Sequence, residues 1–335
     1  MFNGITQRIL KITMPIILIV VFTSILPGCT NAPKIKPGTH SLPEIKSIQD
    51  LQNISLFSFA IMSDNKGDSP KNSRENFKMV KWIKQSDDQF VIGVGDHLKR
   101  GWDNSFLDMI KEDPWWNQNF YPNIADGENE FYGTCQEDWG AGGKLLEELN
   151  FSHHSNVSIR ENGNEYYAKI AVDEYTVHLI QLHYPDSPKD YEKSFPEDSR
   201  QYLKTTLQSI DKGPKDIIIA AAHSRTGFWI DILDEEIKGI VMEKCDLVLS
   251  ATTHYFQRKK LPDYKNSGAL LINTGSVNYP LPLSHGGYVH VSVLENPLSL
   301  IVQYINVEDE DEMVLQDTRH AIRKIIGGKI SFIDF

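Results

Sequence analysis

Short apolar segments that stop abruptly at an acidic residue or a histidine restrict the fold of this chain more than any other feature. Residues 90–97 read Phe-Val-Ile-Gly-Val-Gly-Asp-His, a β-branched run that ends at Gly95-Asp96. This pattern predicts a buried strand followed by a tight turn. The turn would hold the carboxylate of Asp96 at the C-terminal edge of the strand, where open α/β sheets bind ligands.

Other apolar segments end in a similar way. They are residues 56–64, 120–126, 216–223 and 246–250, and they lead to Asp64, Glu128, His223 and His254. Taken singly, each ending is a weak signal, because Gly-Asp is common turn chemistry and a histidine at a strand end often only hydrogen-bonds. The ordered set is stronger, and we expect its members to meet Asp96 at one sheet edge.

Such a set has a chemical consequence. Three carboxylates at one edge repel each other unless cations neutralise them or their pKa values rise. Carboxylate and imidazole ligands together suit a divalent ion such as Mn, Fe or Zn. The sequence therefore predicts a metal site built from strand ends.

The remaining elements follow from periodicity. Helices are predicted at residues 72–84, 101–111, 196–210 and 232–244. Strands alternating with helices in the first part predict parallel β-α-β units. Residues 165–173 and 175–183 alternate apolar and polar side chains around Asp173-Glu174, which predicts an antiparallel hairpin. Residues 270–307 predict three more strands, and we interpret residues 308–335 as an acidic, helical tail.

Composition and charge exclude some partners. The 335 residues are enough for one large domain or two small ones. The formal net charge is −11 and no basic stripe is present, so we expect no nucleic-acid partner. An acidic surface also repels anionic membranes. Any membrane attachment must therefore come from something other than charge.

Residues 1–28 have the form of a signal peptide. Arg8 and Lys11 precede an apolar run, residues 12–26, that is too short for a comfortable membrane span. Residues 26–29 read Leu-Pro-Gly-Cys and resemble the lipobox of bacterial lipoproteins, so we expect a lipidated Cys29 to attach the chain to a membrane. A plain anchor helix is the alternative. Either interpretation places the chain in the bacterial cell envelope, facing the periplasm or the exterior, with residues 29–52 as a flexible tether.

Export also bears on the other two cysteines. In an oxidising compartment a disulfide between Cys135 and Cys245 is allowed. Two separate buried thiols are an equal alternative. The spacing of the two residues does not decide between them.

The strand-end residues resemble those of the calcineurin-like metallophosphoesterases, the superfamily that includes purple acid phosphatases. That family carries Asp-x-His, Gly-Asp, Gly-Asn-His-Asp/Glu, a lone His and Gly-His-x-His, each after a strand. The resemblance covers residues 56–307 and implies an α/β fold, a four-layer α/β/β/α sandwich of two mixed β-sheets flanked by helices. We therefore place a phosphoesterase domain at residues 53–307.

Several positions match the metal ligands of that family. The matching residues are Asp64, Asp96, His223 and His254, and Glu128 stands in place of a ligand Asn. The resemblance implies that Asp96 bridges two metals. It also implies that one or two divalent ions (Mn, Fe or Zn) bind per chain.

Three positions depart from the family pattern. Lys66 stands where the family has a ligand His, and Thr252 replaces the first His of the last pair. Asn129 replaces the His that assists phosphate binding and leaving-group protonation. Lys66 and Asn129 nevertheless occupy the positions from which we expect catalytic side chains to act.

Lys66 changes the expected ligand set. A protonated lysine has no lone pair, so it cannot ligate a metal, and its charge could balance Asp64 and Asp96 instead. Two three-ligand sets remain: Asp96, Glu128 and His223, or Asp64, Asp96 and His254. A metal-free site held by an ion pair between Lys66 and an aspartate is the alternative.

Two functions follow from these residues. The first is a divergent metal-dependent phosphoesterase that acts as a monomer on a small-molecule or polymer phosphate ester through metal-activated water. The second is a catalytically impaired surface lipoprotein that uses the scaffold to bind an anionic ligand. The departures at Lys66, Asn129 and Thr252 motivate the second hypothesis.

Five further residues have two interpretations each. His97 follows Asp96 and either replaces a missing ligand or points away from the site. His183 ends a predicted strand and either lines the pocket or caps the sheet. Three tryptophans either stack on a substrate or close the core, and we expect at least one of them in the core; they are Trp115, Trp116 and Trp139.

Overall fold

The computed structural model describes residues 53–65, 70–97, 105–123, 149, 151, 154–161, 165–183, 196–224, 228–251, 253, 256–259, 269–275, 286–295, 298–307, 314–315, 321–326 and 329–334. All of them lie in the larger of the two units into which the chain divides, Ile35–Phe335. The fold below is that of this unit.

Two mixed β-sheets form its centre. The first has the order β15-β14-β12-β11-β1-β2-β3, with β13 paired to β12, and the second has the order β4-β5-β6-β7-β8-β10-β9. The first sheet consists of β1 (Phe57–Met62), β2 (Val91–Gly93), β3 (Phe120–Pro122), β11 (Gly287–Leu294), β12 (Ser299–Asn306), β13 (Val314–Leu315), β14 (Ala321–Ile326) and β15 (Lys329–Asp334). The second consists of β4 (Val157–Ile159), β5 (Tyr166–Val172), β6 (Tyr175–Leu182), β7 (Asp216–His223), β8 (Leu247–Ala251), β9 (Phe256–Lys259) and β10 (Leu270–Thr274).

Each sheet contains a parallel part. In the first sheet β1, β2 and β3 are parallel, and in the second β6, β7, β8 and β10 are parallel. The predicted hairpin is confirmed, because β5 and β6 pair in antiparallel register around the turn at Asp173-Glu174. Parallel strands end at the same edge of their sheet, so each sheet has an edge where several C-terminal strand ends meet.

The alternation of side chains along the strands builds the layers. In β1, Phe57, Phe59 and Ile61 enter the core between the two sheets, whereas Ala60 and Met62 face a separate apolar cluster on the other side. The second sheet divides in the same way, with a third cluster on its outer face. Three apolar clusters therefore separate four layers.

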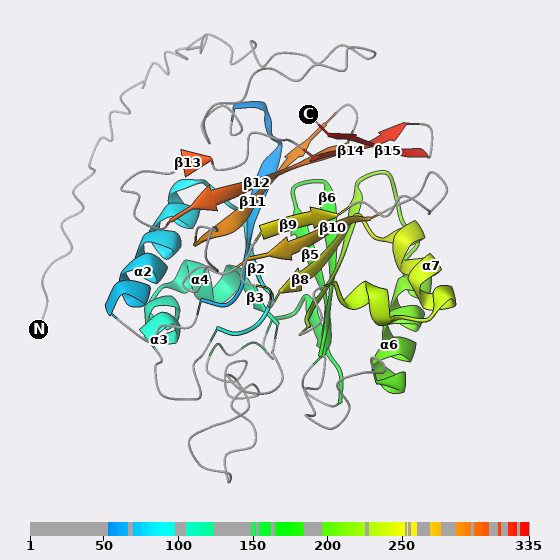
Figure 1. The fold of residues 1–335 in the computed structure, drawn as a ribbon, viewed down its shortest axis with the longest axis horizontal. Coiled ribbons are helices and arrows are strands. Elements are labelled where there is room, and N and C mark those ends of the chain that lie inside the picture. Colours follow the sequence, from blue (N-terminus) through cyan, green and yellow to red (C-terminus); the bar gives the residue numbers. More distant parts are fainter. Residues whose placement is uncertain are drawn as a thin grey trace, which may run out of the picture. The chain divides into compact units, whose positions relative to one another are not determined.

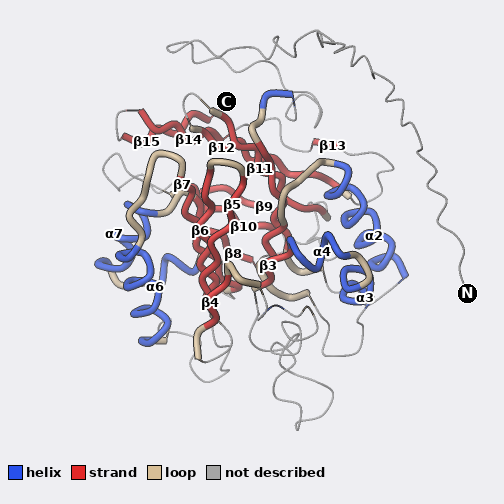
Figure 2. Tube along the Cα trace, turned by 180° about the vertical axis from the view of Figure 1, so that it is seen from behind, coloured by secondary structure: helices blue, strands red, loops and turns tan. Residues whose placement is uncertain are grey.

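Helices cover both outer faces (Figures 1 and 2). The first sheet carries α2 (Pro70–Gln85), α3 (Ser105–Lys111) and α4 (Pro114–Asn119), and the second carries α6 (Glu197–Ser209), the 3-10 turn Trp229–Ile232 and α7 (Glu235–Lys244). Trp116 of α4 is fully buried against the first sheet, and Leu203 of α6 is fully buried against the second. The predicted four-layer α/β/β/α sandwich is confirmed.

Local sequence explains where two of these helices begin. The side chain of Asp113 accepts a hydrogen bond from the backbone N–H of Trp115, and Pro114 occupies the first turn of α4. The side chain of Asp234 accepts from the N–H of Ile237 and caps α7. Both aspartates thus satisfy N–H groups that a helix start leaves without intrahelical partners.

The C-terminal segment corrects one prediction. We expected a helical tail after residue 307, but β14 and β15 form an antiparallel pair and β14 pairs with β12. The helical prediction is wrong, and the first sheet continues into this segment. The overlooked signal is the Gly-Gly pair at 327–328 between two segments rich in isoleucine, which favours a hairpin. The edge strand β9 was likewise not predicted.

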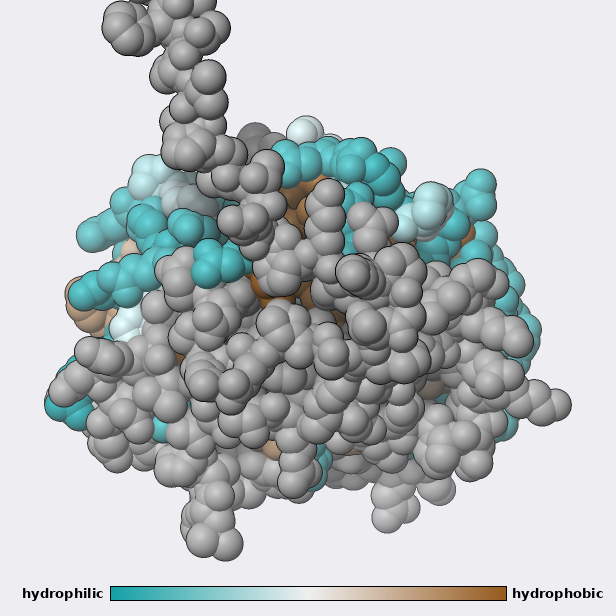
Figure 3. Space-filling view, turned by 90° about the horizontal axis from the view of Figure 1, so that it is seen from above, coloured by the Kyte–Doolittle hydropathy of each residue, from teal (hydrophilic) through white to brown (hydrophobic). Residues whose placement is uncertain are grey.

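The surface of the described residues is mostly hydrophilic where Figure 3 shows it. Among these residues, Leu56 and Phe77 are large apolar side chains that are exposed. Among the described helices, none is long and apolar enough to cross a membrane. The predicted signal peptide, Cys29, the predicted tether and Cys135 lie outside the described residues, and Cys245 is buried beside α7.

Candidate metal centre

Asp64 and Asp96 follow β1 and β2, two neighbouring parallel strands. The ladder between these strands continues beyond them, since the N–H of Val94 donates to the carbonyl of Met62 (2.8 Å) and the N–H of Asp64 donates to the carbonyl of Gly95 (3.0 Å). Both aspartates have positive φ angles, 48° for Asp64 and 56° for Asp96. Left-handed backbone is uncommon outside glycine, and aspartate tolerates it better than most residues. The two strand ends thus turn in the same unusual way and bring their carboxylates together.

His223 reaches the same point from the other sheet. It is the last residue of β7, and its Nε2 lies 3.6 Å from Oδ1 of Asp64 and 3.9 Å from Oδ2 of Asp96. One ligand atom from each of these three residues lies within 4.8 Å of the others. The exposed fractions are 0% for Asp64, 5% for Asp96 and 8% for His223. The cluster therefore spans both sheets at their strand-end edges and is almost fully buried.

A pair of hydroxyl groups lies next to Asp64 and joins the sheets. Oγ of Ser63 is 2.8 Å from Oδ2 of Asp64, 2.5 Å from Oγ1 of Thr274 and 2.7 Å from the carbonyl of Gly275. A hydroxyl has one proton, so Ser63 can donate to one of these groups while it accepts from Thr274. Ser63 therefore fixes the carboxylate of Asp64 relative to the end of β10.

A second polar pair joins the sheets near the end of β3. Asn123 follows β3, and its Nδ2 donates to Oε1 of Gln181 (2.8 Å) and to the carbonyl of Leu182 (2.8 Å). Nε2 of Gln181 donates in turn to the carbonyls of Gly93 (3.1 Å) and Tyr121 (3.2 Å). Because both side chains are buried, these bonds satisfy groups that water cannot reach. They fix the spacing of the sheets beneath the strand-end edge.

His97 is buried and hydrogen-bonded within the protein. Its Nδ1 lies 2.6 Å from Oδ1 of Asn65, and its Nε2 accepts the N–H of Gly95 at 3.2 Å. Since Nε2 accepts, the ring proton is on Nδ1. Burial lowers the pKa of His97 from 6.5 to about 3, although Asp96 acts in the opposite direction. The neutral ring packs against Phe106 and Phe120. The structure therefore favours the interpretation in which His97 points away from the metal site over the one in which it replaces a missing ligand.

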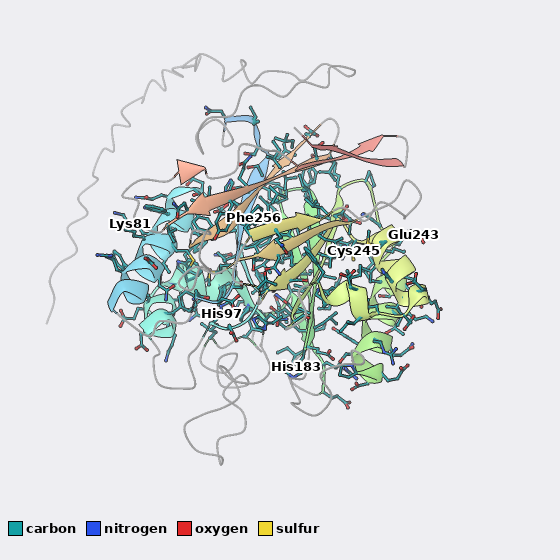
Figure 4. All side chains as sticks on the ribbon, in the orientation of Figure 1. Lys81, His97, His183, Glu243, Cys245 and Phe256 are labelled. Carbon is teal, nitrogen blue, oxygen red and sulfur yellow. The ribbon has the colours of Figure 1, made fainter. Side chains whose placement is uncertain are left out.

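His183, Trp115 and Trp116 differ in burial. His183 follows β6 and is only partly buried, and its N–H donates to Oε1 of Glu165 at 3.3 Å. Figure 4 shows His97 and His183 near the same lower side of the two sheets. Trp116 is in the core, as expected for at least one of the tryptophans, and Trp115 packs against the same cluster.

Several predicted site residues lie outside the described part of the chain. They are Lys66, Glu128, Asn129, Thr252 and His254, and Trp139 lies outside it as well. Ala251, which precedes the segment carrying His254, pairs with His223 in the ladder between β8 and β7. The structure thus brings together three of the predicted metal ligands and leaves the roles of the others as predictions.

The three residues fit a divalent ion. Two carboxylates and one imidazole offer lone pairs to a common point, and this donor set suits a hard or borderline divalent ion. A cation bound between these two buried carboxylates would offset their mutual repulsion. Asp64, Asp96 and His223 combine members of the two three-ligand sets expected from the sequence, and Glu128 and His254, which would complete those sets, lie outside the described residues.

Sequence reasoning missed four residues around this cluster. Ser63 and Asn65 flank Asp64, and Asn123 and Gln181 are polar residues at or near strand ends. A polar residue in an apolar strand, such as Gln181 in the sequence of β6, is a signal that a buried partner exists. The identity of each partner depends on the packing of the two sheets.

The fold can be compared with those of known proteins. No protein-family model and no curated protein matches this sequence. The solved structure of PhoD is 10% identical, its alignment covers 87% of this chain and 73% of that chain, and its TM-score is 0.51. A purple acid phosphatase, PPD1 from yellow lupin (Lupinus luteus) seeds, is 14% identical with a TM-score of 0.49, and its alignment covers 76% of this chain but only 52% of that chain.

These similarities concern the fold. At such low identity they do not transfer an activity, which depends on the residues present at the site of this chain. The two mixed sheets, the helices outside them and the strand-end cluster are all present in the described residues. The described residues share the overall fold of the solved PhoD structure, in agreement with the two-sheet architecture that the resemblance in the sequence implies.

Proposed function

We propose that the protein is a divergent metal-dependent phosphoesterase that hydrolyses a phosphate ester. The observation that carries this proposal is the convergence of Asp64, Asp96 and His223 from two sheets within 4.8 Å. Asp64 and Asp96 follow the neighbouring strands β1 and β2, and His223 ends β7 of the other sheet. Asp87 and Asp173 have the same left-handed backbone in turns outside the cluster, so the proposal rests on the convergence of the three side chains and not on the backbone turns.

The three side chains would hold one divalent ion. Such an ion supplies Lewis-acid polarisation of a phosphoryl oxygen and of water. The protein provides the anionic oxygens of Asp64 and Asp96 and the imidazole of His223. Ser63 orients the carboxylate of Asp64 through its hydroxyl group.

Burial of the cluster has a further effect. Electrostatic interactions are stronger where water is excluded, so the carboxylates of Asp64 and Asp96 attract a cation more strongly than exposed carboxylates would. Fixed backbone turns also keep the carboxylates from reorganising when charge develops. Both effects favour binding of a phosphate ester together with its cation.

The departure at Asn129 suggests which substrates would react fastest. An amide is not a general acid at neutral pH, and general-acid help is typically worth ~100- to 10,000-fold. We therefore propose that esters with good leaving groups are hydrolysed much faster than alkyl phosphates. The substrate class includes small-molecule and polymer phosphate esters.

Purified protein tests the proposal directly. Metal content is measured, and turnover of a panel of phosphomonoesters and phosphodiesters is followed with added Mn²⁺ or Zn²⁺. We expect bound metal and turnover that is lost in Asp96→Ala. Absence of both metal binding and turnover above the Asp96→Ala variant would overturn the proposal.

The sequence departures motivate a second candidate, a non-catalytic binding protein. In this case Lys66 would pair with an anionic group instead of facing a metal. Calorimetric binding of inorganic phosphate that a chelator does not change, in the absence of turnover, would favour the binding protein. Loss of binding on chelation would favour the metal site.

We also propose that the chain is a lipoprotein of the bacterial cell envelope, attached through Cys29. The basic residues, apolar run and terminal cysteine of residues 1–29 support this proposal. Incorporation of labelled fatty acid into the wild type but not into Cys29→Ser tests it. If both forms incorporate the label equally, Cys29 is not the site of attachment.

A further inference from the structure

Asn65 and His97 are adjacent in sequence to the two candidate aspartate ligands and are bonded to each other. Asn65 follows Asp64, and His97 follows Asp96. Oδ1 of Asn65 accepts the Nδ1–H of His97 at 2.6 Å. One hydrogen bond therefore links the two turns that carry the two carboxylates.

The backbone around this bond is held at both ends. Nε2 of His97 accepts the N–H of Gly95, and the carbonyl of Asn65 accepts Nδ2 of Asn76 on α2 at 2.6 Å. Asn65, Asn76 and His97 are all fully buried, with exposed fractions of 0%. The link is thus anchored to helix α2 on one side and to the turn of Gly95 on the other.

The packing leaves little freedom for the ring of His97. A Cβ placed on Gly93 would lie 2.3 Å from its Nε2 and 2.9 Å from Phe120, so a glycine is needed beside the ring. Phe106 stacks on the ring with 6.1 Å between centroids. The ring therefore fills a slot between β2, α3 and β3.

Asn65 also keeps a group that stability alone does not explain. Its Nδ2 is buried and has no hydrogen-bond partner among the described residues. A buried donor without a partner costs ~1–3 kcal/mol, and such groups in native proteins call for an explanation. A role in positioning the adjacent Asp64 is such an explanation.

We propose that Asn65 and His97 are positioning residues that set the separation of the Asp64 and Asp96 carboxylates for divalent-cation binding. This inference rests on the proposed function and adds to it the residues that preorganise the site. Residues that orient metal ligands typically change metal affinity 10- to 100-fold when they are replaced. The link acts through the two strand-end turns, since neither side chain belongs to the cluster of three ligands.

The test measures Mn²⁺ affinity by calorimetry in the full chain. We expect Asn65→Leu, which removes the acceptor, and His97→Phe, which removes both ring nitrogens, each to weaken Mn²⁺ binding ~10- to 100-fold. The double variant should bind Mn²⁺ with an affinity no lower than that of the single variant with the lower affinity, because the two residues share one bond. Asn65→Asp keeps an acceptor for His97 and should restore binding.

A matched control separates positioning from general destabilisation. Ser86 is fully buried, and its hydroxyl donates to the carbonyl of Trp82 at 2.8 Å. It precedes the start of β2, whereas His97 follows the end of that strand. Ser86→Ala should lower the melting temperature but leave the Mn²⁺ affinity unchanged. The visible spectrum of bound Co²⁺ should differ from the wild-type spectrum in Asn65→Leu and not in Ser86→Ala.

The outcomes distinguish this inference from the proposed function. If the wild type binds Mn²⁺ and Asn65→Leu binds it equally well, or if Ser86→Ala weakens binding as much, the positioning role is refuted and the proposed function stands. Additive losses in the double variant refute the shared link. If the wild type binds no Mn²⁺, the proposed function fails, and this inference fails with it.

Discussion

Nε2 of His223 lies 3.6 Å from Oδ1 of Asp64, although the two residues are 159 positions apart and lie at the ends of strands from different sheets. The strand-end edges of the two sheets therefore face a common point. Metal binding at this point would join the sheets directly. Stability and metal binding should consequently be linked.

Metal binding should raise the melting temperature of the wild type. A ligand present at 100 times its Kd stabilises the folded state by ~2.7 kcal/mol. Asp96→Asn removes one anionic ligand, so we expect it to lose most of the Mn²⁺-induced increase. Without metal it should melt at or above the wild-type temperature, because one of two neighbouring buried carboxylates is gone. Thermal scans with Mn²⁺ and with chelator measure both effects, and an equal Mn²⁺-induced increase in the two proteins would exclude Asp96 as a ligand.

Ser63→Ala should destabilise the protein by ~1–3 kcal/mol, because it leaves buried partners of the hydroxyl unsatisfied. Oγ of Ser63 is 2.8 Å from Asp64 and 2.5 Å from Thr274. Urea unfolding measures the loss. Ser209→Ala is the control, since the Ser209 hydroxyl bonds the carbonyl of Thr206 at an exposed helix end and its loss should cost less than ~0.5 kcal/mol. Equal costs for the two variants would contradict the bridging role of Ser63.

Two glycine substitutions should have opposite effects. An alanine Cβ at Gly93 would lie 2.3 Å from Nε2 of His97, so Gly93→Ala should destabilise the protein by at least ~1–3 kcal/mol through overpacking. At Gly239, within α7, an added Cβ meets no atom within 4 Å. Gly239→Ala should stabilise the protein by ~0.4–1 kcal/mol, because alanine favours helix and restricts the unfolded chain. Denaturant midpoints compare the two, and a neutral Gly93→Ala would show that His97 can leave its slot.

Stability should decrease in mild acid through His178. Burial lowers the pKa of His178 below 6.5, and Asp216 acts in the opposite direction. Between the two pKa values the unfolded chain binds a proton and the folded chain does not, so the free energy of unfolding falls as the pH decreases below 6.5. Urea unfolding above and below this pH measures the slope. His178→Gln should make the slope shallower, and an unchanged slope would show that His178 does not contribute.

The strands and the three candidate ligands could be predicted from local sequence. The strand at residues 216–223 matches β7 (Asp216–His223) because its apolar residues leave no alternative to a buried element. Asp64, Asp96 and His223 were predicted because each ends such a strand. Parallel strands in one sheet bring their ends to one edge, so a local pattern was enough to group them.

The C-terminal strands could not be predicted in the same way. A helix satisfies its backbone groups within one segment, whereas a strand needs a neighbour. β14 depends on β12 and β15 for its hydrogen bonds, and its own sequence mixes basic and apolar residues. Pairing with β12 and β15 therefore determines that residues 321–326 form a strand.

The contacts that hold the candidate ligands in place also depend on tertiary structure. Ser63 and Thr274 are 211 positions apart, and Asn123 and Gln181 are 58 apart. Asn65 and His97 are closer in sequence, but they meet only because β1 and β2 are parallel neighbours that end in matching turns. Strand patterns in the sequence specify which side chains reach the sheet edge, because burial of apolar residues is a local requirement. The partners of the polar residues around them are specified only when the two sheets pack, since a hydrogen bond depends on the positions of both groups.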